Sequence, residues 1–421
     1  MKVGFVGPFG DTNFGDYAML VNAIYFLHPA ESIVFTYKPG FLDVLQKQYL
    51  SDFHIQQVVA ENQYRYTPQY GEHYSVEYDD TVLSSAEIFA FISNMETVRE
   101  TVAQIDILYV CGGGYFNRVW SAKHRKGKLI SIMSVILAAE EAGKPIFFGG
   151  NTYGPFDESE ELFRGFFLSL HHARLATRDD VFSIDNLQRM GIRSPIYLLP
   201  DDLYFLDTRL KKIPSTLMKE QGENEYILLE LYSSIEELKT LLPQIRNFVM
   251  VMKQRYHLTV LFVPLDKMYG GEKQADFLKQ EIPELIFLGF DGLEYRRIED
   301  IQHLVQDAKF VLCQRYHLFV LAMANNIPAM NILKDVCGDK RYYYSKTNGL
   351  LRQIFSNQDY DQGLFMTDHI STALEQIASG LYEIQTRQRE FFNDKKELAE
   401  RQMQDKKEQY FSELLEVDMI E

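Results

Sequence analysis

The sequence predicts an α/β protein built of two doubly wound domains that face each other across a cleft. Three observations lead to this prediction. The chain has 421 residues, which exceeds the size that one hydrophobic core usually serves. Short apolar runs, typical of buried strands, alternate with longer helix-like segments. A polar stretch around residues 207–225, which contains Pro214 and Gly222, separates an earlier series of such runs from a later one.

The first domain is expected to span residues 1–206. Strands are predicted at residues 3–6, 33–36, 106–111, 145–148, 174–177 and 196–199, with helices between them that include 17–26 and 127–142. Because strands and helices alternate, the sheet should be mostly parallel, with right-handed crossovers.

The second domain is expected to span residues 225–345 and to repeat this plan. Its predicted strands are residues 226–231, 258–263, 285–288, 310–313 and 329–332, and its helices include 235–256, 298–305 and 314–325. The remaining residues, 346–421, are expected to form a helical extension. Within it, residues 384–416 have the pattern of a charged surface helix that could pack across both domains.

The composition argues against several classes of protein. The formal net charge is −16, which disfavours a nucleic acid duplex or an anionic membrane as the main partner. The cysteines Cys111, Cys313 and Cys337 have no paired spacing and no accompanying cluster of histidines, so a disulfide framework or a zinc site is not expected. We expect no obligatory metal.

No segment has the pattern of a membrane span or of a targeting signal. The longest apolar helix candidate, residues 129–139, is too short to cross a bilayer. The N-terminus continues directly into strand-like residues and does not resemble a signal peptide. The sequence therefore predicts a soluble cytoplasmic protein.

An arginine and a histidine follow the strand predicted at residues 310–313. Arg315 and His317 lie between that apolar run and the helix-forming stretch 318–324. Open α/β sheets bind ligands at the carboxyl ends of their strands, and a helix N-terminus favours anions. Two cationic side chains at such a turn indicate a site for a phosphate or a carboxylate. The alternative is a packed or capping histidine without function.

The chain contains an internal control for this interpretation. Residues 254–258 and 314–318 both read Gln-Arg-Tyr-His-Leu. The first copy, with Arg255 and His257, precedes the apolar run 259–263 and should end a surface helix. We expect no function for Arg255 and His257.

Two glycine-rich loops follow strands of the first domain. The loop from Gly7 to Asp16 leads into a helix, and its glycines allow a close approach of the backbone to a ligand. It lacks the G-x-G-x-x-G spacing of a dinucleotide site. Asn13 is a candidate ligand-binding residue. Asp16 stands where a helix N-cap is expected, so the alternative to a ligand-binding role for Asp16 is to cap this helix. The triplet Gly112, Gly113 and Gly114 could equally serve a ligand or form a sharp turn.

Arg178 also follows a predicted strand, and it should point into the cleft. It is followed by residues 179–183, which would start a helix. The alternative is an ion pair that caps this helix. Pro200, Asp201 and Asp202 follow the next strand and could simply shape the domain boundary.

Taken together, these features resemble the polysaccharide pyruvyl transferase family from Gly7 to about Leu351. The family's G-x-x-G-x-x-N-x-G-D loop is similar to residues 7–16. Further elements of the family, in the same order, match residues 106–114, Lys144-Pro145 to Gly154-Pro155, Arg178 to Ser183 with Leu187 and Gly191-Ile192, Pro200-Asp201, and Arg315, His317, Ala322 and Pro328. Three positions depart from the pattern: Ser183 stands one residue later than the family's spacing, Asp202 replaces the second proline of P-D-P, and Asn326 replaces a glycine.

The resemblance implies a Rossmann-like fold of the GT-B glycosyltransferase type and the transfer of pyruvate from phosphoenolpyruvate to two sugar hydroxyls as a cyclic ketal. Cell-surface or exopolysaccharide biosynthesis is the implied setting, with phosphoenolpyruvate as co-substrate and no other cofactor. His317 would be catalytic, and Arg315, Arg178 and Lys346 would bind the donor; Lys340 is an alternative to Lys346. Asn13, Asp16 and the glycines Gly112, Gly113 and Gly114 would face the sugar or glycan acceptor.

Two other functions remain open at this stage. A nucleotide-sugar glycosyltransferase of the same architecture would commonly place glutamates where Arg315 and His317 stand, so these residues favour an anionic donor. A catalytically silent sugar-binding subunit is the second alternative. The sequence does not define the acceptor sugar, its hydroxyl pair or its carrier, and a homo-oligomer is possible.

Overall fold

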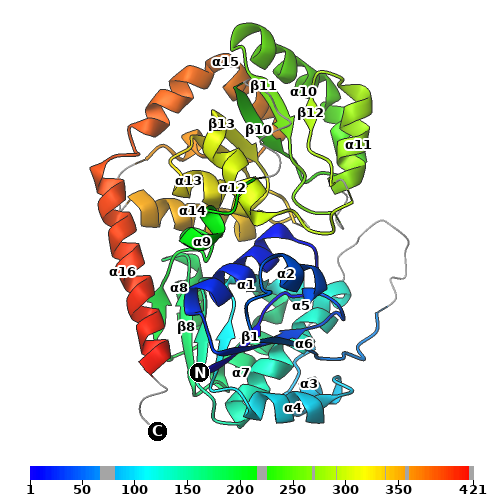
Figure 1. The fold of residues 1–421 in the computed structure, drawn as a ribbon, viewed down its shortest axis with the longest axis vertical. Coiled ribbons are helices and arrows are strands. Elements are labelled where there is room, and N and C mark those ends of the chain that lie inside the picture. Colours follow the sequence, from blue (N-terminus) through cyan, green and yellow to red (C-terminus); the bar gives the residue numbers. More distant parts are fainter. Residues whose placement is uncertain are drawn as a thin grey trace.

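A computed structural model describes residues 1–66, 81–215, 225–267, 271–290, 292–336, 338–355 and 360–416. Two α/β domains, each built on a parallel sheet, lie one above the other in Figure 1. This confirms the predicted fold class. Gly222 of the expected linker and Cys337 lie outside the described residues.

The first sheet has nine strands, and its described pairings are parallel. Its main order is β3-β2-β1-β4-β6-β8-β7-β5, and β9 also pairs with β8. The strands are β1 (Lys2–Val6), β2 (Glu31–Thr36), β3 (Ile55–Val59), β4 (Ile107–Val110), β5 (Gly113–Phe116), β6 (Ile146–Phe148), β7 (Asn151–Tyr153), β8 (Ala173–Thr177) and β9 (Ile196–Leu198). The central strands β1 and β4 are almost entirely buried, which explains their continuous apolar sequences.

Helices cover both faces of this sheet. They are α1 (Phe14–Leu27), α2 (Leu42–Gln48), α3 (Ser85–Ala90), α4 (Met95–Ala103), α5 (Arg118–Ser121), α6 (Lys123–Glu141), α7 (Glu160–Leu168) and α8 (Phe182–Arg189), and the short α9 (Thr208–Lys211) follows the last strand. Helix α1 begins three residues earlier than expected, with Asn13 at its N-cap position. The expectation that Asp16 caps this helix was therefore wrong, because Asp16 lies inside the first turn.

The second sheet has six strands in the order β12-β11-β10-β13-β14-β15. The strands are β10 (Tyr226–Glu230), β11 (Thr259–Phe262), β12 (Ile286–Phe287), β13 (Phe310–Cys313), β14 (Ala329–Ile332) and β15 (Met366–Thr367). The helices are α10 (Ile235–Arg255), α11 (Gly271–Glu281), α12 (Ile298–Asp307), α13 (Tyr316–Ala324), α14 (Arg341–Phe355), α15 (Ile370–Arg389) and α16 (Asp394–Glu416).

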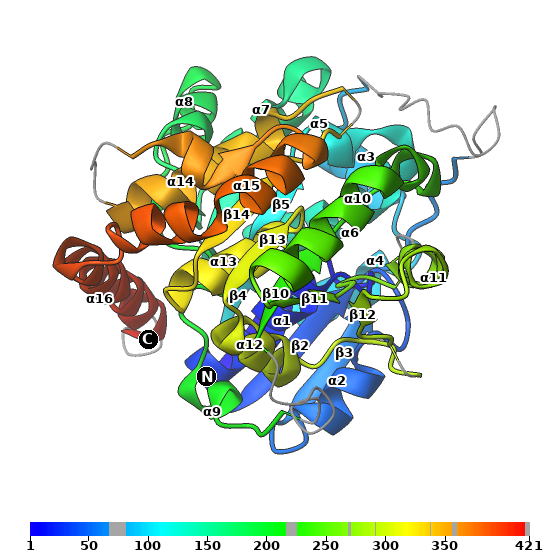
Figure 2. The same cartoon turned by 90° about the horizontal axis from the view of Figure 1, so that it is seen from above.

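The described residues from Lys346 to Glu416 contribute to both domains. Strand β15 extends the second sheet beside β14, and α15 lies alongside α10 (Figures 1 and 2). Helix α16 then returns to the first domain, where the Tyr410 hydroxyl donates to the Phe148 carbonyl at 2.8 Å. The Phe411 ring lies 5.5 Å from that of Tyr109. Most of the α16 sequence is charged, but one apolar stripe along the helix is buried against the first domain.

The strand order reverses between β1 and β4 in the first sheet and between β10 and β13 in the second. Ligands of open α/β sheets bind beyond the carboxyl ends of the strands at such points. The two reversal points face each other, because Thr12 of the loop after β1 approaches Asp266 of the loop after β11 (Oγ1 to Oδ1, 3.5 Å).

The domains are joined by buried contacts on one side of this region. The Tyr17 hydroxyl of α1 donates to the Arg296 carbonyl at 2.7 Å. The Tyr49 hydroxyl donates to Glu299 at 2.7 Å and accepts from the Ile298 N–H at 2.8 Å. Among the described residues, no helix is both long and apolar enough to cross a membrane.

Candidate functional site

The turn between β13 and α13 is built around the carboxylate of Glu230. Arg315 occupies the N-cap position of α13 with an extended backbone. The N–H groups of Gln314 and Arg315 donate to Glu230 Oε2, at 3.1 and 2.8 Å. Glu230 is the last residue of β10, the neighbour of β13. The site is thus placed at the reversal point of the second sheet.

Two carboxylates and an aromatic ring hold the Arg315 guanidinium. Its Nε lies 3.9 Å from Glu230 Oε1, and one Nη lies 3.5 Å from Asp266 Oδ2. The guanidinium stacks 3.8 Å above the Tyr232 ring centroid. Burial raises the pKa of Glu230 to about 7, although Arg315 opposes the rise. The cation is therefore fixed in position beside a carboxyl group that titrates near neutrality.

His317 is almost enclosed, and it is held in its neutral form. Its side chain is 13% exposed, and its Nε2 lies 3.8 Å from Asp201 Oδ2. Among the described residues, Nε2 has no hydrogen-bond partner. Burial lowers the pKa of His317 to about 3, and the charges of Arg178, Lys346 and Arg315 add to this effect against the opposing Asp201. A neutral imidazole can accept a proton.

Arg178 reaches the same carboxylate from the first domain. It directly follows β8 and is completely buried. It forms an ion pair with Asp201, and its Nε donates to Thr152 Oγ1 at 2.8 Å. Its guanidinium lies 4.8 Å from the Tyr316 ring centroid. Asp201 therefore connects Arg178 of the first domain with His317 of the second.

Lys346 lies on α14 among three tyrosines. Its Nζ is 3.8, 4.2 and 5.1 Å from the ring centroids of Tyr343, Tyr342 and Tyr316. Burial, followed by the charge of Arg178, lowers the pKa of Lys346 well below its ordinary value. Within the described ranges, no carboxylate oxygen lies within 4.0 Å of this amine. Lys346 therefore lies near Arg178 and Arg315, whereas Lys340 is half-exposed and its Nζ donates to the Asp368 carbonyl at 3.0 Å.

The N-terminus of α1 closes the site from the first domain. Gly15 packs so closely on His317 that a Cβ atom at this position would lie 1.8 Å from Nδ1. Asp16 follows it with a buried carboxylate that is hydrogen-bonded to the Asn13 side chain. Burial raises the pKa of Asp16 to about 7. The loop predicted from its glycines thus lies directly against the predicted histidine.

The glycine triplet approaches protein side chains. The N–H of Gly112 donates to Asp202 Oδ2 at 2.9 Å. A Cβ atom at Gly114 would lie 2.3 Å from the Tyr342 hydroxyl oxygen. Gly113 begins β5, with a backbone φ of 152°. Gly114 therefore borders the site through Tyr342, whereas Gly112 anchors the strand end to Asp202.

The structure brings most of the predicted residues together and adds others. His317, Arg315, Arg178, Lys346, Asp16 and, through Tyr342, Gly114 surround one region between the domains. Other residues orient these side chains and were not predicted as site residues. They are Gly15, Asp201, Glu230, Asp266, Tyr316, Tyr342 and Tyr343. For Asp201 a signal existed, because it follows a strand as Arg178 does.

The other copy of the five-residue pattern lies on the surface. Arg255 is the last residue of α10 and is exposed, and one Nη donates to the Ala378 carbonyl at 3.4 Å. His257 is exposed and has a positive φ of 57°. The copy therefore ends a helix and leads into β11, as its sequence context predicts.

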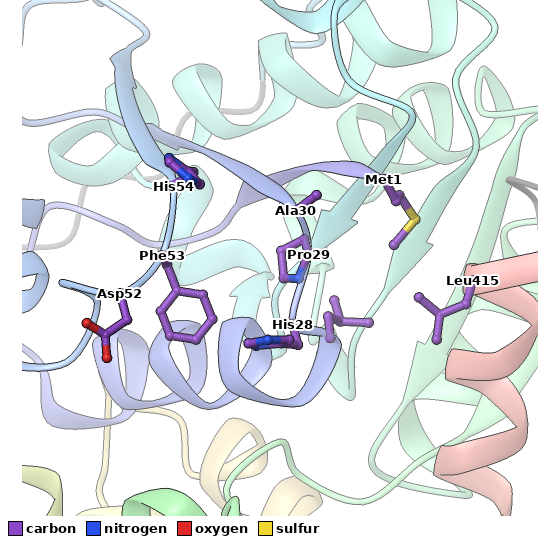
Figure 3. Close-up of a pocket in the computed structure, with 9 residues that line it drawn as sticks. Met1, His28, Pro29, Ala30, Asp52, Phe53, His54 and Leu415 are labelled. Atoms are coloured by element: carbon purple, nitrogen blue, oxygen red, sulfur yellow. The ribbon is translucent and has the colours of Figure 1, made fainter.

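Two other possibilities for a site receive no support from the described residues. The first is a metal site: the described residues contain no group of three or more His, Cys, Asp or Glu side chains that could hold a metal ion. A pocket of about 470 Å³ lies at the amino ends of β1, β2 and β3, lined by residues that include His28, Asp52, His54 and Leu415 (Figure 3). It contains none of the predicted site residues.

Comparison with known proteins agrees with this geometry. The family model described as polysaccharide pyruvyl transferase matches residues 13–333, more than half of the chain. The match begins at Asn13, and it includes Arg178, Arg315 and His317. No curated protein matches the sequence.

Several solved structures share the fold at low sequence identity. HepE of Anabaena, in complex with UDP-glucose, has a TM-score of 0.56 at 14% identity, and the match covers 98% of this chain and 99% of HepE. The UDP-GlcNAc 2-epimerase of Neisseria meningitidis, bound to UDP-GlcNAc, has a TM-score of 0.54 at 13% identity, with coverages of 92% and 94%. A putative UDP-N-acetylglucosamine 2-epimerase of Listeria monocytogenes has a TM-score of 0.55 at 12% identity, with coverages of 92% and 89%. These likenesses establish a GT-B-like fold, and the family match shows that the chain belongs to the polysaccharide pyruvyl transferase family.

Proposed function

We propose that this protein transfers pyruvate from phosphoenolpyruvate to two hydroxyls of a sugar, which produces a cyclic ketal. The observation that carries the proposal is the convergence of Arg178, Arg315, Lys346 and a neutral His317 between the domains of a chain whose net charge is −16. The product would serve cell-surface or exopolysaccharide biosynthesis.

The cations suit a donor that carries a phosphate and a carboxylate close together. Arginine guanidinium groups bind both anions in a forked geometry, and the N-terminus of α13 adds the positive end of a helix dipole. Arg178 and Arg315 are already oriented by carboxylates, so their forks are fixed before the donor arrives. A bound anion would also offset the cost of burying the Lys346 amine among tyrosines.

The reaction requires two additions at the same carbon. In the first, a hydroxyl oxygen of the sugar bonds to C2 of phosphoenolpyruvate while C3 gains a proton and becomes a methyl group. In the second, another hydroxyl oxygen bonds to C2 as the C2–O bond to phosphate breaks. Each attacking hydroxyl loses a proton, so a proton-accepting group is needed within hydrogen-bonding distance. His317 is our candidate.

The acceptor would approach from the first domain. Asn13, Asp16 and Gly114 lie on that side of the site, opposite the donor-binding residues of α13 and α14. Asn13→Ala should therefore raise the KM for the acceptor more than the KM for the donor. An effect confined to the donor would reverse this assignment of the two sides.

The test is phosphate release from phosphoenolpyruvate in the presence of candidate acceptors. The acceptor series should include nucleotide-linked, lipid-linked and polymeric sugars, and mass spectrometry should follow the pyruvylated product. We expect phosphate release that depends on an acceptor and that is lost in His317→Gln. Sugar transfer from UDP-glucose, without any use of phosphoenolpyruvate, would instead support the glycosyltransferase alternative and overturn the proposal.

A further inference from the structure

We propose that Asp16 is a second proton-transfer residue, which works with His317 from the opposite side of the site. This inference rests on the proposed function and adds a catalytic residue to it. The ketal reaction moves protons at three positions, namely two hydroxyls and one methylene carbon. A single imidazole would have to serve all of them, whereas two groups on facing domains can divide the work.

The first support is the position of Asp16. It lies in the first turn of α1, directly after Gly15, and Gly15 touches the His317 ring. Asp16 therefore follows a segment of the first domain that packs against the imidazole. The residue is 8% exposed, and the side chain of Asn13 donates a hydrogen bond to its carboxylate.

The second support is the set of charges that face Asp16. Asp11 of its own loop and Asp266 of the second domain repel its negative form, whereas Arg315 of α13 stabilises it. Lys346 and Tyr342 of α14 and Tyr115 of β5 also interact electrostatically with it. These groups come from both domains, and they include Arg315 and Lys346, so the carboxylate is close enough to interact with the proposed donor-binding cations.

Helix capping does not account for this carboxylate. Asn13 occupies the N-cap position of α1, and its side chain makes no capping hydrogen bond. An acidic group in a first turn is normally stabilised as an anion by the helix dipole. Here burial prevails and raises the pKa to about 7. Near neutral pH the side chain can therefore be a proton donor or a proton acceptor.

The proton transfers balance when the two residues start as a neutral imidazole and a protonated carboxyl. In the first addition, His317 takes the proton of the attacking hydroxyl, and Asp16 gives its proton to C3. In the second addition, the Asp16 carboxylate takes the proton of the other hydroxyl, and the His317 imidazolium gives its proton to the departing phosphate. Both residues return to their starting forms.

The experiment compares Asp16→Asn, Asp16→Glu and Asp185→Asn in acceptor-dependent phosphate release across pH. Asp16→Asn should lower kcat by about 10²–10⁴-fold with little change in the KM for phosphoenolpyruvate, in line with the loss of a general acid–base group. Asp16→Glu keeps a titratable carboxyl and should recover part of the rate. Asp185, an exposed aspartate in the first turn of α8, is the matched control, and Asp185→Asn should retain the wild-type rate.

The pH profile separates catalysis from a structural role. Because the protonated carboxyl is the active form, kcat/KM of the wild type should fall as pH rises through about 7. This fall should be absent in Asp16→Asn. A variant that keeps the wild-type rate, or that loses rate while keeping the alkaline fall, overturns the inference and leaves the proposed function intact. A wild-type protein that releases no phosphate with any acceptor overturns both.

Discussion

The segments 254–258 and 314–318 have the same five residues and opposite surroundings. In the first, Arg255 ends α10 and His257 is exposed before β11. In the second, Arg315 opens α13 after β13, and His317 is nearly enclosed between the domains. The same side chains therefore meet solvent at a helix C-terminus in one place and carboxylates at a helix N-terminus in the other.

The comparison shows that position in the fold, and not the pattern itself, gives these residues their chemistry. A cation in the last turn of a helix is favoured by the helix dipole, which is a sufficient structural reason for Arg255. Arg315 lies at the N-terminus of α13, which is the positive end of the helix dipole. A cation is disfavoured there unless acidic groups or a bound anion balance its charge. Glu230 and Asp266 supply part of that balance.

The largest effect is expected from the two histidines. His317→Gln retains hydrogen bonding but cannot transfer a proton, so kcat should fall by about 10²–10⁴-fold with donor affinity retained. His257→Gln should leave steady-state phosphate release unchanged. If His317→Gln kept the maximal rate and lost only donor affinity, His317 would be a binding residue.

Gly15→Ala should have the next largest effect, because the new methyl carbon would stand 1.8 Å from His317 Nδ1. The imidazole or α1 must then move, and a displacement of about 1 Å can reduce the rate by about 10²-fold. The matched control is Gly165→Ala in α7, where a Cβ atom would meet nothing within 4 Å. Equal activity of the two variants in the phosphate assay would show that His317 is not held as described.

Arg315→Ala should weaken phosphoenolpyruvate binding by roughly 1.5–3 kcal/mol, the range for hydrogen bonds to charged groups. Arg255→Ala should not change it, and calorimetric titration can measure both variants. The loss of Arg315 also leaves Glu230 and Asp266 without a cation that balances their charge, so melting temperatures should be recorded. Unchanged donor affinity in a folded Arg315→Ala protein would contradict the assignment.

A last prediction concerns stability at acidic pH. Because burial lowers the pKa of His317 from 6.5 to about 3, the folded state binds this proton less readily than the unfolded state. Protonation therefore favours unfolding, and the cost should begin below about pH 6.5 and grow until about pH 3. His317→Asn should lose less stability than the wild type over this window in thermal unfolding, and parallel curves would show that His317 is not held neutral.

The elements of the fold were largely predictable because local patterns specify them. Apolar runs predicted most of the strands. Turn-forming residues predicted the loops at the two points where the strand order reverses, between β1 and β4 and between β10 and β13. The expected strand at 285–288 is shorter in the structure, with only Ile286–Phe287 paired. The roles of residues 346–416 were less visible, because β15 and α16 depend on partners far away in the sequence.

The candidate site was predictable where a residue or a glycine-rich loop follows a strand. Arg178, Arg315, His317 and the loops that contain Asp16 and Gly114 were predicted in this way, and the family resemblance indicated Lys346. The pairing of Asp201 with Arg178 and the contact of Gly15 with His317 were not predictable, since each joins segments that only the tertiary fold brings together. The contacts of Lys346 with the rings of Tyr316 and Tyr343 were also not predictable, because they depend on how α14 packs against α13.

The most direct test of the central claim is an experimental structure with phosphoenolpyruvate bound at saturating concentration. We expect its phosphate and carboxylate to lie against Arg178, Arg315 and Lys346, with C2 and C3 facing His317 and with the surface segment around Arg255 empty. A donor bound elsewhere on the protein, or a region between the domains that stays empty while phosphoenolpyruvate is turned over, would contradict the claim.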